Sequence, residues 1–279
     1  MPWPGAEPES RASAADAGTP TTAHYWEHVG RVWQRSHPHA LWRAHSDAVN
    51  VSLFSAWLPH QPIDRLLKTD LFDEAFGEGF FTLLAARARR VVGIDLAGLT
   101  AAAASVRHGT LQAIAADVRQ LPFPDATLDV IVSNSTLDHF ATRQDVDASL
   151  RELRRVLRPG GSLLLTMDNL DNPFVALRNA IPFALLSWLG LVPYYVGATY
   201  GSDGLRRAMR AAGLQVCEVR PVMHCPRIVA VALARLVQRF AGPRGRDRFL
   251  GVLMRFERLS LWPTRDVTGY LVAVRAIRP

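Results

Sequence analysis

Cysteine is scarce in this sequence of 279 residues, with only Cys217 and Cys225 present. Two cysteines cannot build the disulfide framework of a small secreted fold, and this pair lacks the spacing of a zinc-ligand motif. We therefore expect no metal site, and we expect a reducing compartment, the cytoplasm.

Lysine is scarcer still, because Lys68 is the only lysine among 32 basic residues. Against 25 acidic residues this leaves a net charge of +7, which would suit RNA, an acidic substrate or an anionic membrane. An arginine-biased genome explains the lack of lysine better than any of these functions does. No block of about five or more basic residues occurs, so a nucleic-acid partner is not expected.

Long uncharged stretches are also few. The longest, 179–202, reads NAIPFALLSWLGLVPYYVGATYGS and approaches the length of a membrane span. Pro182, Gly190, Pro193 and Gly197 interrupt it. We therefore expect a broken, largely buried cap, and a peripheral contact with a membrane stays open.

The N-terminal part of the chain divides into two segments. Residues 1–22 are rich in Ala, Pro, Ser and Thr, and no basic segment precedes an apolar core, so we expect a flexible leader rather than a secretory signal. Residues 23–62 then carry aromatic and aliphatic side chains at helical spacing, and Pro38 should divide them into two N-terminal helices.

Beyond this part the apolar residues gather in short runs. Those expected to form strands are 71–75, 90–96, 111–117, 128–135, 162–168, 214–222 and 269–277. Helix-length segments separate most of them, which is typical of buried parallel strands in βαβ units and predicts an α/β fold. Two apolar segments, about 172–200 and 225–262, do not fit this alternation, and we expect both to be insertions that form a cap.

The stretch LFDEAFGEGF indicates a ligand-binding turn. We expect a first strand that ends at Asp73, and then a turn in which Gly77 and Gly79 let the backbone approach a ligand at a helix N-terminus. Open parallel sheets bind ligands at the carboxyl ends of their strands. Asp95 ends the second expected strand, at about the interval from the turn at which an acid binds ribose hydroxyls, and Asp117 ends the third.

Five segments follow one another in a specific order, namely DEAFGEG, VVGID, ADVRQLPF, LDVIVSNS and LRPGG. This order resembles the class I S-adenosylmethionine-dependent methyltransferases, especially the small-molecule group that includes the ubiquinone and menaquinone biosynthesis enzymes. The resemblance covers about residues 66–170, and the general fold extends over 203–222 and 268–279. It implies a three-layer sandwich with a mostly parallel seven-stranded sheet, a methyltransferase domain over 63–279, and S-adenosylmethionine as cofactor.

The family pattern implies a role for each matching residue. Around the methionine part of the cofactor it places Asp73, Ala75, Gly77 and Gly79. It gives Asp95 the ribose hydroxyls, Leu96 the adenine ring, Asp117 the adenine amino group, Val118 a backbone contact to the adenine, and Asn134 a position below the sulfonium.

Two positions depart from the D-x-G-x-G-x-G turn that is usual in the family. Ala75 replaces the first glycine, and Glu78 adds an acid where the ammonium end of the methionine could lie. An alanine forced to positive φ costs of the order of 1 kcal/mol, which a fold tolerates. We expect the turn still to bind the cofactor, in a slightly shifted pose.

Methyl transfer from a sulfonium is a one-step displacement, and positioning contributes more to its rate than a general base does. His139 would act as the base only for an acceptor that must lose a proton. Residues that could line the acceptor site are Tyr25, Asn169, Tyr194, Tyr200 and His224. The apolar insertions favour a bulky hydrophobic small molecule such as a quinone precursor, a polyketide, a lipid or a glycoside.

Other functions stay open at this point. An RNA methyltransferase would suit the net charge, although SNSTL after the fourth expected strand is unlike the NPPY type of the base amino-group enzymes. A cofactor-binding regulator that has lost catalysis would suit the departures at Ala75 and Glu78. A nicotinamide-dependent dehydrogenase is least favoured, because the sequence has no Tyr-x-x-x-Lys pair. The acceptor atom and the oligomeric state are not specified.

Overall fold

The computed structural model describes residues 22–36, 40–189 and 191–279, and most of the expected leader, 1–21, lies outside them. The described residues form a seven-stranded sheet in the order β3-β2-β1-β4-β5-β7-β6. β7 is antiparallel to both of its neighbours, and the remaining pairs are parallel. The strands are β1 (Ile63–Thr69), β2 (Ala88–Asp95), β3 (Gln112–Ala115), β4 (Leu128–Asn134), β5 (Leu157–Asp168), β6 (Gln215–Val222) and β7 (Leu271–Ile277). The predicted fold class is confirmed.

Helices precede and connect these strands. The two N-terminal helices are α2 (Ala23–Ser36) and α3 (Ala40–Trp57). The connections within the sheet contain α4 (Phe72–Phe76), α5 (Phe81–Arg87), α6 (Gly98–Arg107), η1 (Leu137–His139), α7 (Arg143–Val156) and α10 (Ser202–Ala211). The segments after β5 and β6 contain α8 (Pro173–Ala180), α9 (Phe183–Trp188), α11 (Arg227–Phe240), α12 (Pro243–Arg255), η2 (Phe256–Leu261) and α13 (Arg265–Thr268).

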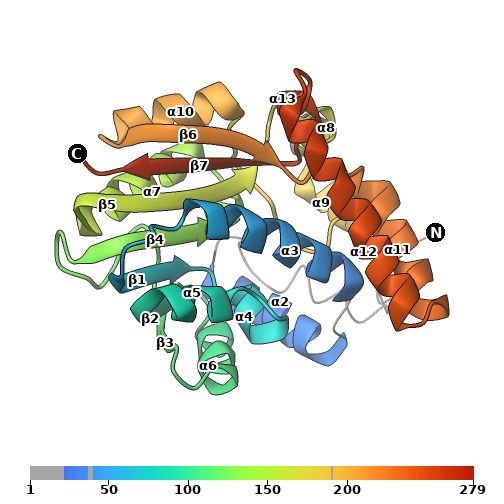
Figure 1. Ribbon diagram of the computed structural model, residues 1–279, viewed down its shortest axis with the longest axis horizontal. Coiled ribbons are helices and arrows are strands. Elements are labelled where there is room, and N and C mark those ends of the chain that lie inside the picture. Colours follow the sequence, from blue (N-terminus) through green and yellow to red (C-terminus); the bar gives the residue numbers. More distant parts are fainter. Residues whose placement is uncertain (1–21, 37–39, 190) are drawn as a thin grey trace.

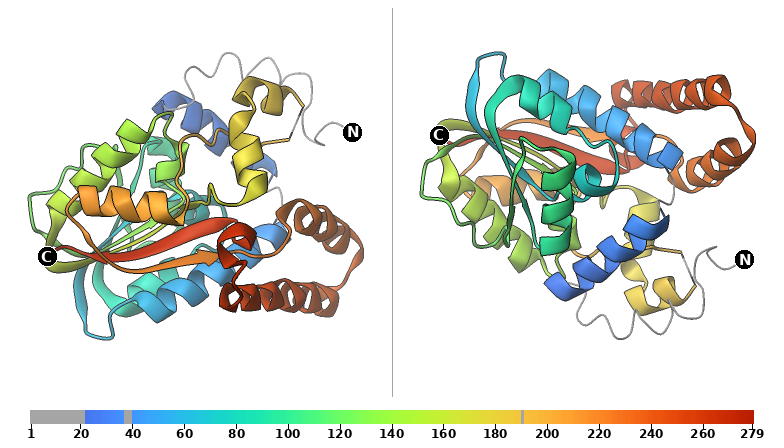
Figure 2. Two further views of the ribbon diagram at one scale, coloured as in Figure 1. Left: turned by 90° about the horizontal axis from the view of Figure 1, so that it is seen from above. Right: turned by 90° about the horizontal axis from the view of Figure 1, so that it is seen from below.

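The sheet forms the middle layer of the molecule. α3 and α5 lie on one of its faces, and α7 and α10 lie on the other (Figures 1 and 2). Successive side chains of a strand point to opposite faces, so Leu163 and Leu165 of β5 enter one core cluster and Leu164 enters the other. β4 is buried along its whole length because helices cover both of its faces.

The first strand does not lie where the apolar pattern predicts it. β1 is IDRLLKT, whereas LFDEA, the predicted strand, contributes most of the helix α4. The amide of Ala75 donates to the carbonyl of Leu71 at 2.8 Å, as in a helical turn. The prediction is wrong because Arg65 and Lys68 break the apolar run of the true strand; Arg65 is exposed, and Lys68 is buried with a partner.

The two segments that the sequence assigns to a cap are helical, but they are not largely buried. Phe174, Trp188 and Leu191 are 62%, 67% and 63% exposed. The short helices α8 and α9 each have one buried residue, Val175 and Leu186, and their exposed apolar side chains are Phe174, Leu177, Leu185 and Trp188. Over the ranges that the structure describes, no helix combines the length and the apolar character that crossing a membrane requires.

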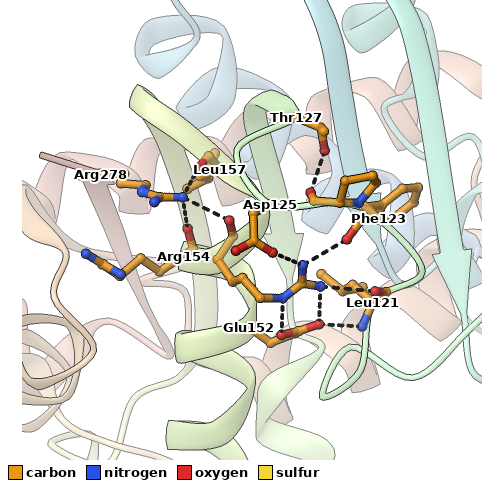
Figure 3. A network of polar contacts seen from close by, with 10 residues as sticks. Leu121, Phe123, Asp125, Thr127, Glu152, Arg154, Leu157 and Arg278 are labelled. Atoms are coloured by element: carbon orange, nitrogen blue, oxygen red, sulfur yellow. Dashed lines mark hydrogen bonds and ion pairs between the residues drawn. The ribbon is translucent and has the colours of Figure 1, made fainter.

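The amino end of the sheet is fastened by arginines (Figure 3). Arg155 of α7 donates to the Phe123 carbonyl at 2.9 Å, to Asp125 at 2.6 Å and to Glu152 at 2.7 Å. These carboxylates raise the pKa of Arg155 further above its ordinary value, chiefly through the hydrogen bond with Glu152. Glu152 in turn accepts the Leu121 amide at 2.7 Å. The network holds the connection between β3 and β4.

Candidate active site

A pocket lies at the carboxyl ends of β1 to β4, where the strand order reverses between β1 and β4. Open α/β sheets bind ligands at such a point. Residues expected from the sequence that line the pocket are Asp73, Asp95, Leu96, Asp117, Val118, Asn134, His139 and Tyr194. Lining residues without a predicted role at the site include Arg43, Asp70, Phe72, Thr100 and Phe140.

The turn after β1 is built around a buried ion pair. Lys68 Nζ lies 2.7 Å from Glu74 Oε2, and both side chains are at most 1% exposed. Burial lowers the pKa of Lys68, but the nearby Glu74, Asp70 and Asp73 outweigh it and the pKa is raised. Lys68 also donates to the Asp70 carbonyl. Sequence reasoning missed this pair, although a lone lysine among 32 basic residues was a signal.

Gly79 serves this ion pair rather than the pocket. It has φ +56°, and a Cβ at this position would lie 2.7 Å from Glu74 Oε1. The same oxygen accepts the Phe80 amide at 3.1 Å. A side chain at residue 79 would therefore be strained and would also collide with the buried acid.

The other residues predicted around the methionine also lie off the pocket wall. Ala75 lies within α4, so the missing glycine does not belong to a loop that cradles a ligand. Gly77 ends α4 and lies against Arg43, whose Nη2 would be 3.0 Å from an added Cβ. Glu78 is 89% exposed and pairs with Arg107 at 3.2 Å. Of this predicted set only Asp73 lines the pocket.

Asp70 takes the position at the end of β1. Its φ of 65° turns the chain sharply, and its Oδ1 accepts the Phe72 amide at 2.8 Å, which closes a local turn. Desolvation raises the pKa of Asp70 well above its ordinary value, and the nearby Asp95 adds to this. Asp70 was missed because the sequence places the end of the first strand at Asp73.

Asp95 ends β2 and ties two turns together. Its Oδ2 accepts the Leu71 amide at 3.0 Å, and its Oδ1 accepts the Ala97 amide at 2.8 Å. Burial raises the pKa of Asp95 to about 6, although both backbone hydrogen bonds lower it. Each carboxylate oxygen has a second lone pair, so Asp95 can accept further hydrogen bonds from a ligand in the pocket.

Asp117 lies just beyond β3 and is paired with Arg119. The guanidinium of Arg119 lies 2.7 Å from Asp117 Oδ2 and 2.9 Å from Asp145 Oδ1, and it stacks 4.9 Å from the ring centroid of Phe140. Hydrogen bonds with the two acids raise the pKa of Arg119, the bond with Asp117 most strongly. Val118 is 5% exposed and continues the apolar wall beside Asp117.

Two polar residues form the base of the pocket at the end of β4. Asn134 Oδ1 accepts the Thr166 hydroxyl at 2.7 Å, which fixes the amide so that its NH₂ group remains a donor. Ser135 follows with φ 46°, and its amide donates to the Thr166 carbonyl at 2.9 Å. The sharp turn at Ser135 therefore ends β4 at the pocket.

His139 lies in η1 among aromatic rings. Its Nδ1 lies 2.9 Å from the Tyr195 carbonyl and must carry the proton there, because a carbonyl only accepts. Its ring centroid is 4.6 Å from that of Trp26 and 5.7 Å from that of Tyr194. In this tautomer Nε2 carries a lone pair, so it can accept a hydrogen bond from a group in the pocket.

The remaining acceptor candidates do not line this pocket. The Asn169 side chain donates to the Asp266 and Gly269 carbonyls, at 2.7 Å and 2.9 Å, and fixes the segment before β7. His224 is bonded to Thr268 and to the Pro221 carbonyl, and Tyr200 donates to Asp147. Tyr25 accepts the Tyr195 amide at 2.8 Å and packs behind Trp26. These four side chains are therefore engaged in hydrogen bonds within the fold, away from the pocket wall.

Arg43 and Asp73 face the pocket as an ion pair. Arg43 Nη2 lies 2.6 Å from Asp73 Oδ1, and the two side chains are 14% and 25% exposed. The guanidinium also stacks over Trp33 and Phe72, at 5.1 Å and 5.3 Å from the ring centroids. One fixed cation and one fixed anion side by side can bind an α-amino acid group, whose ammonium and carboxylate carry the opposite charges.

The pocket is otherwise acidic. Its acidic lining is Asp70, Asp73, Asp95 and Asp117, beside Arg43; burial favours the neutral form of Asp70, so the negative charge lies chiefly on the other three acids. Such a wall attracts a cation and repels a phosphate chain. Over the described ranges, no group of three or more His, Cys, Asp or Glu residues is placed to hold a metal ion.

Comparison with protein families finds one domain in the chain. Residues 72–165 match the family model described as a methyltransferase domain. A probable S-adenosylmethionine-dependent methyltransferase of Mycolicibacterium smegmatis is 29% identical over 179 residues, which is 64% of this chain and 62% of that protein. A ubiquinone/menaquinone biosynthesis C-methyltransferase of Paraburkholderia phymatum is 36% identical over 75 residues, covering 26% and 30% of the two chains. The matches thus span less than two thirds of these relatives.

Solved structures share the fold over most of the chain. Geranyl diphosphate C-methyltransferase from Streptomyces coelicolor has a TM-score of 0.54 at 13% identity, with 83% of this chain and 77% of that chain covered. The [4+2]-cyclase SpnF has the same TM-score at 16% identity, with 82% and 80% of the two chains covered. Since one of these proteins is named a cyclase, the shared fold alone does not specify the reaction.

Proposed function

We propose that this chain, which belongs to the class I S-adenosylmethionine-dependent methyltransferases, transfers a methyl group to a small and largely apolar acceptor. The observation that carries the proposal is the pocket at the strand switch point, where Asp95 and Asp117 lie at successive strand ends. The bound cofactor would supply an activated methyl group on a sulfonium. The acidic wall suits that cation.

The cofactor would be held by two groups of residues. For the adenosine part, Asp95 would accept the ribose hydroxyls, and Asp117, Leu96 and Val118 would bind the adenine. For the amino-acid part we assign Arg43 and Asp73, because their ion pair complements an ammonium and a carboxylate. Arg43 thus takes over a role that the family resemblance implied for Ala75, Gly77 and Gly79.

The acceptor would enter against the aromatic side of the pocket. Trp26, Phe140 and Tyr194 line it, and an apolar wall excludes water and favours a hydrophobic molecule. His139 would take the proton of an acceptor that is an alcohol, a phenol or an acidic carbon, through Nε2. Positioning by the rings would contribute most of the rate in either case.

Neither alternative from the sequence is favoured. An RNA substrate would bring phosphates toward an acidic wall that contains Asp73, Asp95 and Asp117, which is electrostatically unfavourable. A regulator without catalysis was suggested by Ala75 and Glu78, but neither residue lines the pocket. The departures from the family turn therefore do not close the site.

Isothermal titration with S-adenosylmethionine and S-adenosylhomocysteine tests the cofactor. The wild type should bind both, and Asp95→Asn should weaken binding by roughly tenfold or more, because a charged acceptor is lost. Asp203→Asn, an exposed acid on α10, is the matched control and should bind like the wild type. Circular dichroism would establish that Asp95→Asn is folded. No binding by the folded wild type would refute the proposal.

The acceptor class is tested separately with a labelled methyl group. Label should appear in products that an organic solvent extracts from an incubation with apolar phenols, quinols and fatty acids. RNA and short polar acceptors should remain unlabelled. Transfer to those instead, with cofactor binding intact, would overturn the acceptor class and leave the cofactor assignment standing.

A further inference from the structure

The net charge of the chain is concentrated in one segment. Residues 225–262 contain eight arginines, Arg227, Arg235, Arg239, Arg244, Arg246, Arg248, Arg255 and Arg258, and only two acids, Asp247 and Glu257. They therefore carry six of the seven net positive charges, and the rest of the chain is nearly neutral. One charge of each sign is turned inward: Glu257 accepts the Met223 and His224 amides at 3.0 Å and 2.9 Å, and the Arg227 guanidinium lies 4.4 Å from the Tyr270 ring centroid.

The same segment exposes apolar side chains in an ordered way. On α11, residues at helical spacing form an exposed stripe, Val229, Leu233, Leu236 and Phe240, which are 56%, 45%, 55% and 76% exposed. Another side of the helix, at Ala230 and Ala234, is buried within the core cluster that includes α3 residues. The stripe is thus a second apolar surface, which no described part of the chain covers.

Further exposed apolar residues lie at the same end of the molecule. Leu261 and Trp262, after α12, are 85% and 61% exposed, and Trp188 of α9 is 67% exposed. α8 and α9 follow β5, and α11 and α12 follow β6, so both pairs extend from the carboxyl edge where the pocket lies. Figure 2 shows α11 and α12 side by side and projecting beyond the sheet.

We propose that α11, α12 and the Leu261–Trp262 turn form a peripheral binding surface for an anionic lipid bilayer. Interfacial helices combine aliphatic and aromatic side chains, which enter the acyl boundary, with basic residues that meet anionic headgroups. Arg239, Arg244, Arg248 and Arg255 are exposed beside the apolar stripe or on the next helix. Arginine can reach the headgroups while its methylene stem lies along apolar surface.

Two other occupants fit the surface less well. A second copy of the chain would bring six positive charges against six identical ones across a symmetric interface. RNA would neutralise the arginines but would leave the aliphatic stripe of α11 in water, because nucleic acid binds through phosphates and stacked bases. An anionic bilayer satisfies the charge and the apolar stripe together.

Vesicle sedimentation tests the proposal with the full chain. The wild type should pellet with vesicles of phosphatidylcholine and phosphatidylglycerol and not with phosphatidylcholine alone, and added salt should weaken the binding. Arg244→Glu/Arg248→Glu should weaken it by roughly tenfold or more, since each basic residue near the surface contributes. Leu233→Ser/Leu236→Ser should weaken binding at low and at high salt alike, because this variant loses apolar contact with the bilayer, which salt does not screen.

Matched controls separate the surface from general charge and general hydrophobicity. Arg207→Glu/Arg210→Glu on α10 changes the net charge equally, and Val106→Ser on α6 removes an 87% exposed apolar residue. Both should bind vesicles like the wild type. Circular dichroism checks the fold, and the charge variant tests the proposal even if the apolar variant is unstable.

Three outcomes would overturn the membrane assignment. The first is that the wild type fails to bind the anionic vesicles. The second is that Arg207→Glu/Arg210→Glu on α10 weakens binding as much as Arg244→Glu/Arg248→Glu on α12 does. The third is a concentration-dependent dimer in light scattering that Leu233→Ser/Leu236→Ser abolishes while vesicle binding is absent, which would assign the stripe to a second copy. Because vesicle binding needs no cofactor or acceptor, its result is independent of the proposed reaction.

Discussion

The turn after β1 and the turn after β3 meet at one pocket, but they are built in different ways. After β3, Asp117 and Arg119 are neighbours in sequence and remain partly in solvent, with side chains 28% and 35% exposed. After β1, Lys68 and Glu74 lie in the protein interior and hold α4, Gly79 and the Phe80 amide in place. The first turn is fixed by burial, and the second by local hydrogen bonds.

Because of this difference, the effect of a substitution on ligand binding can be measured apart from its effect on stability at one turn but not at the other. At the β3 turn a ligand-facing acid can change without disturbing the core, since solvent screens its ion pair. At the β1 turn the two groups that hold the chain, Lys68 and Glu74, are themselves part of the core, although neither lines the pocket. We therefore expect substitutions of Lys68 or Glu74 to lower the stability of the fold before they reveal anything about binding.

The largest effect is expected from Lys68→Met. Removing one partner of a buried ion pair leaves the other charge uncompensated, which costs roughly 3–5 kcal/mol. The free energy of unfolding, measured by urea denaturation, should fall by about that amount. Arg31→Met, which breaks the exposed Arg31–Glu27 pair at 3.4 Å, should have no measurable effect.

A double variant refines this comparison. Lys68→Met/Glu74→Leu removes both charges and should recover most of the lost stability, because an apolar pair of similar volume often replaces a buried ion pair without net cost. If the double variant were as unstable as Lys68→Met alone, the loss would come from packing or from the Asp70 carbonyl contact, and not from an unpaired charge.

The next effect is a pH dependence at Asp47, which lies beside the same turn. Burial raises the pKa of Asp47 to about 7, and Asp73 adds to the shift. The neutral carboxyl thus stabilises the fold at low pH, and this contribution is lost as the pH rises from about 4 through 7. Each pKa unit is worth about 1.4 kcal/mol, so roughly 4 kcal/mol is the upper bound.

Asp47→Asn removes this titration. At pH 8 the variant should be more stable than the wild type, and the advantage should shrink as the pH is lowered to 5. Urea denaturation at both pH values measures the difference, with Asp203→Asn as an exposed control. Parallel pH profiles for the wild type and Asp47→Asn would show that Asp47 does not titrate in this range.

Gly79→Ala should destabilise the protein by about 2–3 kcal/mol. The positive φ alone costs an alanine about 1–2 kcal/mol, and the close approach of Glu74 adds strain. Gly160 is a control, because it has φ +76° and nothing within 4 Å of an added Cβ. Gly160→Ala should show the backbone cost only. Equal losses in thermal unfolding would mean that Glu74 moves aside freely.

The sequence predicted the β2 and β3 turns because their signals are local. An acid at the end of a short apolar run indicates a strand end: Asp95 ends β2, Asp117 lies two residues beyond β3, and both line the pocket. It misplaced β1 because Lys68 looks like a surface residue until its partner is known. Glu74 is six residues further along the chain, and no regular spacing of a strand predicts that the two side chains meet. Only the folded chain brings them together.

The two cap segments also show that sequence reasoning could not predict which residues are brought together or buried by the fold. Composition marked 172–200 and 225–262 as apolar, but it could not show which side of each helix faces the core. Ala230 and Ala234 make the buried side of α11, whereas the larger Leu233 and Leu236 are exposed. Small residues fit where helices pack closely. On α11 the small alanines are therefore buried and the leucines exposed, the opposite of the usual expectation that the largest apolar residues are inside.

The smallest effect on stability, and the clearest one on binding, is expected at Asp117. Asp117→Asn keeps an oxygen for the Arg119 amide and loses only a partly exposed ion pair, so unfolding should change by less than about 1 kcal/mol. Titration with S-adenosylmethionine should nevertheless show roughly tenfold weaker binding. Asp145→Asn is the control. It weakens the other contact of Arg119, at 2.9 Å, and Asp145 does not line the pocket. If both variants weakened binding equally, Asp117 would act by positioning Arg119 rather than by contacting the cofactor.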